Sequence, residues 1–173
     1  MDGGGPPRIV RTARPSDDEQ VIRIVVPGTP KALARNRHRI ITPKGKAPFV
    51  GNYLPAKSRN EQAVIRDFAA QAMGGRALLE GPIDLRIAAY LAIPPSWSKK
   101  KQQAARNDFL RPTGRPDIDN LTKQIDALKE IVWRDDAQVT DAAMWKRYSD
   151  EPRLVIEIRQ IVLADKTLWD NAA

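Results

Sequence analysis

The residues best suited to chemistry are an aspartate pair and a lysine near the middle of the second half of the chain. Asp117 and Asp119 stand two residues apart, and Lys123 follows within the same short segment. A second pair, Asp135 and Asp136, lies beyond the next apolar stretch. Carboxylate oxygens are ligands that Mg²⁺ and Mn²⁺ prefer, and a cation held by them activates water and stabilises charge on a phosphoryl group. The pattern predicts a metal-dependent site that hydrolyses phosphodiesters.

The residues around the first pair predict how its carboxylates are presented. Pro116 fixes its own φ and keeps Arg115 extended. In an extended segment residues i and i+2 point to the same face, so Asp117 and Asp119 could share a cation. Asn120 is a favourable N-cap for a following helix. The two carboxylates would then lie at a helix N-terminus, where backbone N–H groups favour a phosphate.

A helix is predicted over about residues 121–131, because four apolar residues recur on one helical face. These residues are Leu121, Ile125, Leu128 and Val132. Lys123 would lie in the first turn, either as a contact to the scissile phosphate or as a plain solvated lysine. A chain that turns back along this helix would bring Asp135 or Asp136 to the first pair. The competing interpretation makes all these aspartates ordinary turn and capping residues.

Charge is strongly segregated along the chain. It has 29 Lys and Arg against 21 Asp and Glu, a net charge of +8, and no acidic residue between positions 20 and 60. A surface of one sign attracts a polyanion, although a merely soluble basic protein would show the same net charge. The candidate DNA-binding residues are Lys31, Arg35, Arg37, Arg39, Lys44, Lys46, Lys99, Lys100, Lys101 and Arg115.

Several classes of site are excluded by composition. The chain has no cysteine and its one histidine is His38, so disulfides, thiolate zinc sites and two-histidine metal sites cannot form within one chain. No run of about 20 apolar residues predicts a membrane span. The N-terminal residues lack the apolar stretch of a secretory signal, so we expect a cytoplasmic protein without a membrane partner.

One domain is expected over residues 19–164, between a disordered N-terminal tail, 1–18, and a loose C-terminal tail, 165–173. Strands are predicted over 21–26, 83–93, 137–148 and 154–162, the last half-exposed because Glu157 and Arg159 alternate with apolar residues. Besides 121–131, helices are predicted over 57–73, capped by Ser58 and ended by Gly74, and, as a short piece, over 98–106. This β-α-β-α-β-β order predicts an α+β fold, a mixed sheet of about four strands with two main helices packed on it.

The basic segment over residues 31–49 is predicted as either a loop or an irregular hairpin. It contains or adjoins apolar residues that are unusual for a free basic loop. They are either a dimer face or a local core beneath a long loop. These residues are Ile40, Ile41, Phe49, Val50, Tyr53 and Leu54.

Three motifs together suggest a family. The chain reads PSWSKKK over residues 95–101, RPDIDNLTK over 115–123 and WRDDAQV over 133–139. These motifs resemble the signature of the RusA-type Holliday junction resolvases, and the similarity extends from about residue 21 to residue 162. The resemblance implies a homodimeric endonuclease, dependent on Mg²⁺ or Mn²⁺, that resolves four-way (Holliday) DNA junctions by paired symmetric nicks in DNA recombination and repair.

The resemblance also assigns residues to the reaction. Its catalytic and metal-binding carboxylates fall on Asp117, Asp119 and Asp136, with Asp135 as a candidate further ligand, and its active-site lysine falls on Lys123. Two other interpretations stay open. One is a non-catalytic protein that binds branched DNA, and the other is a metal-dependent nuclease for other branched substrates.

Overall fold

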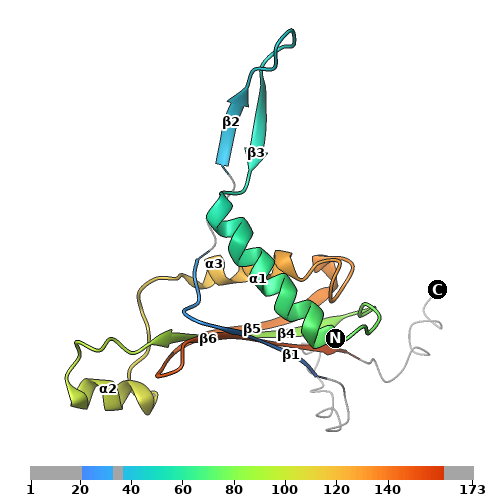
Figure 1. Ribbon diagram of the computed structural model, residues 1–173. Helices are drawn as coiled ribbons and strands as arrows, with labels where there is room; N and C mark the ends of the chain where they lie inside the picture. Colours follow the sequence, from blue (N-terminus) through green and yellow to red (C-terminus); the bar gives the residue numbers. More distant parts are fainter. Residues whose placement is uncertain (1–20, 33–36, 162–173) are drawn as a thin grey trace, which may run out of the picture.

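A mixed four-stranded sheet forms the centre of the computed structural model, which describes residues 21–32 and 37–161 (Figure 1). The strands lie in the order β1 (Ile22–Pro27), β6 (Arg153–Gln160), β4 (Ile83–Ala92) and β5 (Val139–Ser149). β4 pairs in parallel with β5 and antiparallel with β6, and β1 pairs antiparallel with β6. The predicted α+β fold with a mixed sheet of about four strands is therefore confirmed.

Some of the predictions concern residues outside the described ranges. They are the two expected tails, at 1–18 and 165–173, and the DNA contact assigned to Arg35. Within the described ranges, the helices are too short or too polar for any of them to cross a membrane.

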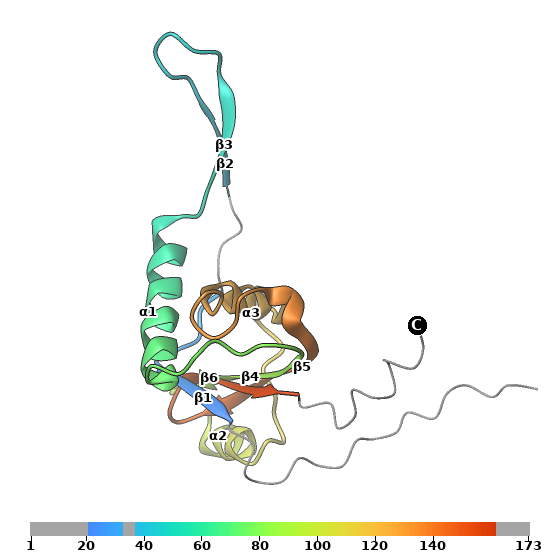
Figure 2. The ribbon, with the colours of Figure 1, turned by 90° about the vertical axis from the view of Figure 1, so that its right-hand side faces the viewer.

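Three α-helices flank the sheet. They are α1 (Ala56–Met73), α2 (Lys99–Arg106) and α3 (Ile118–Thr122). Figure 2 shows α1 and α3 on one face of the sheet and α2 beyond the other. The connection from β4 to β5 carries α2, α3 and two 3₁₀ turns, η1 (Lys123–Ala127) and η2 (Asp136–Gln138). Parallel neighbours need such a long crossover, and here it holds most of the candidate site.

Helix α1 covers β1 with the buried residues Ile65, Ala69 and Met73. Gly74 ends it in the left-handed conformation, with φ 55°, as predicted. The predicted cap is wrong, because the N-cap residue is Pro55 and Ser58 lies buried inside the helix. Pro55 is extended, with φ −54° and ψ 144°, and the helix begins at the next residue, Ala56, two residues before Ser58.

The basic segment forms a hairpin of β2 (Arg37–Ile41) and β3 (Phe49–Tyr53), so the hairpin interpretation is the correct one. Figure 1 shows this hairpin projecting away from the sheet, beyond the N-terminal end of α1. Ile40, Phe49 and Val50 are 73%, 53% and 67% exposed. A local core beneath a loop is therefore wrong for these three side chains.

The single helix predicted over 121–131 is wrong. The chain forms α3, then the tighter turn η1. The Thr122 hydroxyl donates to the Ile118 carbonyl oxygen at 3.1 Å, a back-bond that bends helices. Gln124 is buried in η1 and donates to the Lys31 carbonyl oxygen at 2.8 Å. The predicted apolar face still packs into the core, with Ile125 partly buried and three residues fully buried, namely Leu121, Leu128 and Val132.

Candidate active site at the start of α3

Asp117 and Asp119 lie where α3 begins. Asp117 is the N-cap residue, in an extended conformation, and Asp119 lies in the first turn. Asn120 was the predicted N-cap, but it lies inside α3. Because Asp119 is already helical, the two aspartates do not form the predicted extended i, i+2 pair. Both carboxylates are solvent-exposed, so an ion can reach them.

A lysine of β5 binds the backbone of the segment that precedes Asp117. The Lys146 ammonium donates to the carbonyl oxygens of Gly114 and Pro116, at 2.7 and 3.0 Å. Pro116 itself is buried. The chain that delivers Asp117 is therefore fixed to the sheet from two points on its backbone.

Lys123 lies next to the first carboxylate pair. Its ammonium nitrogen is 3.5 Å from Asp119 Oδ2 and donates to Asn120 Oδ1 at 2.8 Å. Lys123 follows α3 as its C-cap residue, rather than lying in the first turn. A cation at a helix C-terminus is electrostatically favourable, whereas in the predicted first-turn position it would have opposed the helix dipole.

A tight turn brings the second aspartate pair back toward this region. Glu130 adopts φ 63°, and its N–H donates to the Trp133 carbonyl oxygen at 2.8 Å. Trp133 is fully buried, and its indole N–H donates to Asp136 Oδ1 at 2.8 Å. A core side chain thus orients the Asp136 carboxylate.

Asp135 has different partners. It accepts hydrogen bonds from the Ala137 N–H at 3.0 Å and from the Lys129 ammonium at 2.8 Å, and it caps η2. The hydrogen bond from Lys129 is the largest cause that lowers the pKa of Asp135. These contacts give Asp135 a structural role in holding the turn that presents Asp136.

Asp126 connects the two acidic groups, and the sequence prediction did not include it among the site residues. Its carboxyl pKa is raised, first by partial burial and then by the negative charge of Asp136, while Lys123 and Lys129 lower it. Asp126 follows Lys123 by three residues, a helical spacing that could have indicated it. The resulting series of interacting charges runs from Asp119 through Lys123 and Asp126 to Asp136.

The donor chemistry of this region suits a hard divalent cation. Within residues 21–32 and 37–161, no three carboxylate or imidazole side chains are grouped closely enough to hold a metal ion. Asp117, Asp119 and Asp136 therefore do not form one compact cluster in a single chain. Mg²⁺ does not require one, since it is commonly bound through one or two carboxylates, several waters and substrate phosphates.

The candidate DNA contacts are divided between two elements far apart on the molecule. Lys44 and Lys46 lie in the exposed hairpin turn, and the Arg39 guanidinium carbon is 5.8 Å from the centre of the Tyr53 ring. The backbone of Arg37 starts β2. At the other end, α2 carries Lys99, Lys100 and Lys101. Figure 1 shows α3 at an intermediate level, between the hairpin above and α2 below.

The other two candidate contacts lie nearer to α3. Lys31 pairs with Glu61 at 2.6 Å, and Arg115 is exposed two residues before Asp117. On α2, the Lys101 ammonium lies 4.0 Å from the centre of the Trp97 ring. The candidate DNA contacts thus lie on the hairpin, on α2 and on the two segments that carry Lys31 and Arg115.

Comparison with known proteins gives two findings. The family model described as Endodeoxyribonuclease RusA matches residues 27–159. A Bacillus subtilis (strain 168) protein with the name Uncharacterized protein YqaN is 36% identical over 143 residues, which cover 81% of this chain and 96% of the relative. The family match includes β4, β5 and β6 up to Arg159, together with every described residue of the acidic site, but of β1 it includes only Pro27. The chain therefore belongs to the RusA endodeoxyribonuclease family, a family of Holliday junction endonucleases.

Proposed function

We propose that this protein is a Mg²⁺- or Mn²⁺-dependent endonuclease that resolves four-way DNA junctions by paired nicks, in recombination and repair. The observation that carries the proposal is the linked group of charges around Lys123. Its ammonium nitrogen lies 3.5 Å from Asp119 Oδ2 and donates to Asn120 Oδ1 at 2.8 Å. Partial burial and the negative charge of Asp136 raise the pKa of the nearby Asp126 carboxyl. Repelling carboxylates beside an exposed aspartate pair are a favourable environment for a divalent cation.

Each residue of the group has a chemical task in this proposal. Asp117, Asp119 and Asp136 would supply the carboxylates for the cation, one or two of them binding it directly and water and substrate phosphate completing its ligands. When bound, the cation would polarise the phosphoryl oxygen and lower the pKa of a water molecule. The Trp133 indole keeps Asp136 in one orientation. Asn120 holds the Lys123 ammonium beside Asp119, where it can stabilise negative charge that develops on the phosphate.

Nicking of a synthetic four-way junction with Mg²⁺ tests the proposal. We expect Asp119→Asn to reduce the nicking rate by about a hundredfold or more, because a metal-held phosphate loses several kcal/mol of stabilisation. Junction affinity should stay close to that of the wild type. Asp141→Asn, which removes an exposed carboxylate on β5, is the matched control and should nick normally.

The outcomes separate the competing functions. If the wild type nicks the junction no faster than Asp119→Asn does, the enzyme proposal fails and the protein is a binder of branched DNA. If the wild type cuts flaps and forks as readily as four-way junctions, the substrate is broader than proposed. Loss of both binding and cutting in Asp119→Asn, with an altered circular dichroism spectrum, would indicate misfolding, and Asp117→Asn then provides the second test.

We further propose a homodimer, formed through the projecting hairpin. Paired nicks in opposite strands require two identical sites, which a two-fold dimer provides. Ile40 and Val50 are directly opposite in the β2–β3 register, and both are mostly exposed. A two-stranded hairpin is marginally stable alone in water, so burial of this pair against a second copy supports both the hairpin and the dimer.

A further inference from the structure

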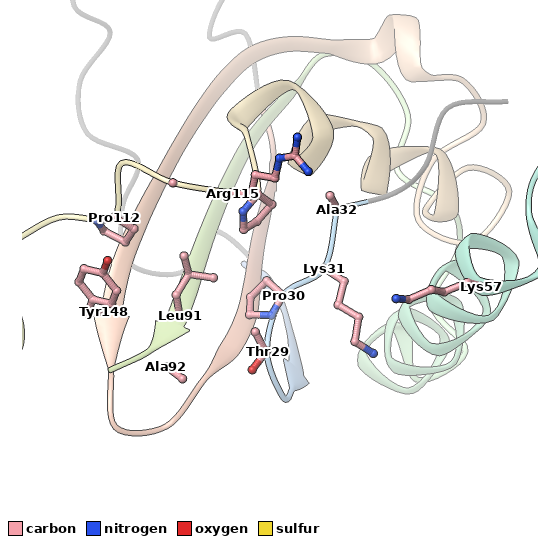
Figure 3. Close-up of a pocket in the computed structure, with 12 residues that line it drawn as sticks. Thr29, Pro30, Lys31, Ala32, Lys57, Leu91, Ala92, Pro112, Arg115 and Tyr148 are labelled. Carbon is pink, nitrogen blue, oxygen red and sulfur yellow. The ribbon is translucent and has the colours of Figure 1, made fainter. Parts of the chain in front are cut away.

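A cavity of about 510 Å³ lies beside the start of α3 (Figure 3). It is open to solvent, and its lining comes from the segment at residues 29–32, the ends of β4 and β5, and the loop that leads into α3. Much of its lining is apolar. The apolar residues include Pro30, Leu91, Pro112 and Pro116, all of them buried. The volume falls within the roughly 300–1,000 Å³ of pockets that hold small organic ligands.

Three cationic side chains line the same cavity. Figure 3 shows Lys31 and Lys57 extending toward one another from one side, and Arg115 on another side, close to the start of α3. Lys31 is held at 2.6 Å by Glu61. Among the residues that the structure describes, neither Lys57 nor Arg115 has an ion-pair partner. An apolar lining beside free cations fits a ligand with a flat apolar body and phosphate groups.

We propose that this cavity binds one unpaired nucleotide of the DNA strand at the exchange point of the junction. The base would lie against Pro30 and Pro112, and its flanking phosphates would contact Lys57 and Arg115. The proposal rests on the proposed function, because it needs a DNA substrate at the acidic site. Removing a base from its stack is least costly where pairing is already interrupted. A four-way junction offers that condition at its exchange point.

The position of the cavity links this nucleotide to the candidate reaction centre. Arg115 and Pro116 lie in the cavity wall and lead directly into Asp117. On the opposite wall, Gln124 donates to the Lys31 carbonyl oxygen at 2.8 Å and so fixes that wall to η1, immediately after Lys123. A nucleotide held in the cavity would therefore place a neighbouring phosphate near the aspartates. The same arrangement would favour branched DNA over a fully stacked duplex.

Filling the cavity tests the proposal. Gly114 lines the cavity, and a Cβ atom there would meet no atom within 4 Å, so Gly114→Phe adds bulk without a backbone clash. Thr113→Phe is the matched control, since Thr113 is exposed in the same loop but does not line the cavity. The assays are metal-free binding of a four-way junction and of its duplex arm. A second readout is the fluorescence of 2-aminopurine at the exchange point.

We expect Gly114→Phe to weaken junction binding by about tenfold while duplex binding stays unchanged. The wild type and Thr113→Phe should raise 2-aminopurine fluorescence as the base leaves its stack, and Gly114→Phe should not. Equal junction affinity and equal fluorescence in all three proteins would overturn the proposal. If Gly114→Phe unfolds, Ala92→Phe provides a second filling variant, because Ala92 is an exposed residue of the lining at the end of β4.

Two further arms keep this test separate from that of the proposed function. If the wild type nicks the junction but Gly114→Phe changes neither junction affinity nor 2-aminopurine fluorescence, the nucleotide cavity is refuted and the endonuclease proposal stands. A cavity-dependent fluorescence change without any nicking refutes the endonuclease and retains the cavity. Free dCMP that suppresses the 2-aminopurine signal without displacing the junction would assign the cavity to soluble nucleotides, and would overturn the proposed DNA ligand.

Discussion

Asp126 is the residue of the candidate site whose pKa is raised. The residue is exposed as a whole, yet its carboxyl group is partly removed from water, and this burial is the first cause of its raised pKa. The negative charge of Asp136 adds to the rise, and Lys123 and Lys129 oppose it. In the absence of a divalent cation, ionisation of Asp126 therefore opposes folding.

We expect Asp126→Asn to stabilise the metal-free protein at neutral pH. A raised pKa means that the folded protein binds this proton more readily than the unfolded chain does, so the unfolding free energy decreases as pH rises from the unfolded pKa, about 3.9, through the folded pKa. The variant lacks this decrease. In urea unfolding with EDTA, the advantage of the variant over wild type should grow across that interval and then level off.

Magnesium provides the control for this prediction. If the acidic group holds Mg²⁺, saturating Mg²⁺ should raise the unfolding free energy of the wild type more than that of Asp126→Asn, because binding to the folded state is linked to stability. A variant whose advantage is the same at every pH, with and without Mg²⁺, would show that Asp126 does not experience the charge of Asp136.

Residue types and spacing were sufficient to predict some residues of the site but not the contacts between them. Asp119 and Lys123 could be selected because acids and a lysine share one short segment. The contact between Trp133 and Asp136 depends on the turn at Glu130, whose φ is 63°. A non-glycine residue in this conformation gives little advance signal in a sequence. The spacing of Asp126 from Lys123 could have indicated their interaction, but the effect of Asp136 on Asp126 depends on the same three-dimensional turn.

At the scale of elements, hydrophobic periodicity predicted which faces are buried better than it predicted helix type or strand environment. The face of Leu121 and Leu128 is buried although the backbone changes from α to 3₁₀ between them. The strand predicted as half-exposed is β6, where Ile156 and Ile158 are fully buried and Glu157 and Arg159, on the other face, are partly exposed as predicted. Val155 on that second face is nevertheless buried at 5% exposure, because β6 lies between β1 and β4. Strand order decides this burial, and a single strand's alternation does not encode its neighbours.

One contact between helix α2 and the rest of the molecule is a bidentate ion pair. Arg106 Nε and one terminal nitrogen donate to the two oxygens of Asp150, at 2.8 and 2.9 Å. Asp150 lies in the turn between β5 and β6. Ala105 is the buried residue of the helix. The orientation of Lys99 and its neighbours therefore depends on this pair.

We expect Arg106→Gln to increase amide hydrogen exchange over residues 99–106, because loss of the pair lets α2 open locally. Exchange in β4 should not change. The increase should be modest, since exposed ion pairs contribute little to stability. Arg86→Gln is the matched control, as Arg86 pairs with Asp84 at 3.2 Å within β4 and does not touch α2. Equal exchange over α2 in both variants would assign its docking to apolar contacts instead.

At the scale of the whole molecule, basic groups on the hairpin and on α2 lie on opposite sides of the acidic site (Figure 1). Six to ten phosphate contacts would give junction binding a slope of about −5 to −9 in log affinity against log salt. Lys46→Ala should reduce the magnitude of that slope by about one. Arg23→Ala is the control, because Arg23 pairs with Glu157 at 3.6 Å on β1, and it should leave the slope unchanged. A slope near zero in the wild type would contradict binding through the basic elements.

The proposed homodimer has the same hairpin at its interface. If Ile40 and Val50 meet a second copy, Ile40→Glu buries a charge at the interface and should convert the dimer into a monomer in sedimentation experiments. Phe109→Glu is the matched control, since Phe109 is 83% exposed in the loop after α2 and lies outside the hairpin. The monomeric variant should nick single strands of a junction without the paired second cut, because each site still holds its own Asp117 and Asp119. A wild type that sediments as a monomer and still makes paired cuts would refute the hairpin interface, since one site would then serve both strands in turn.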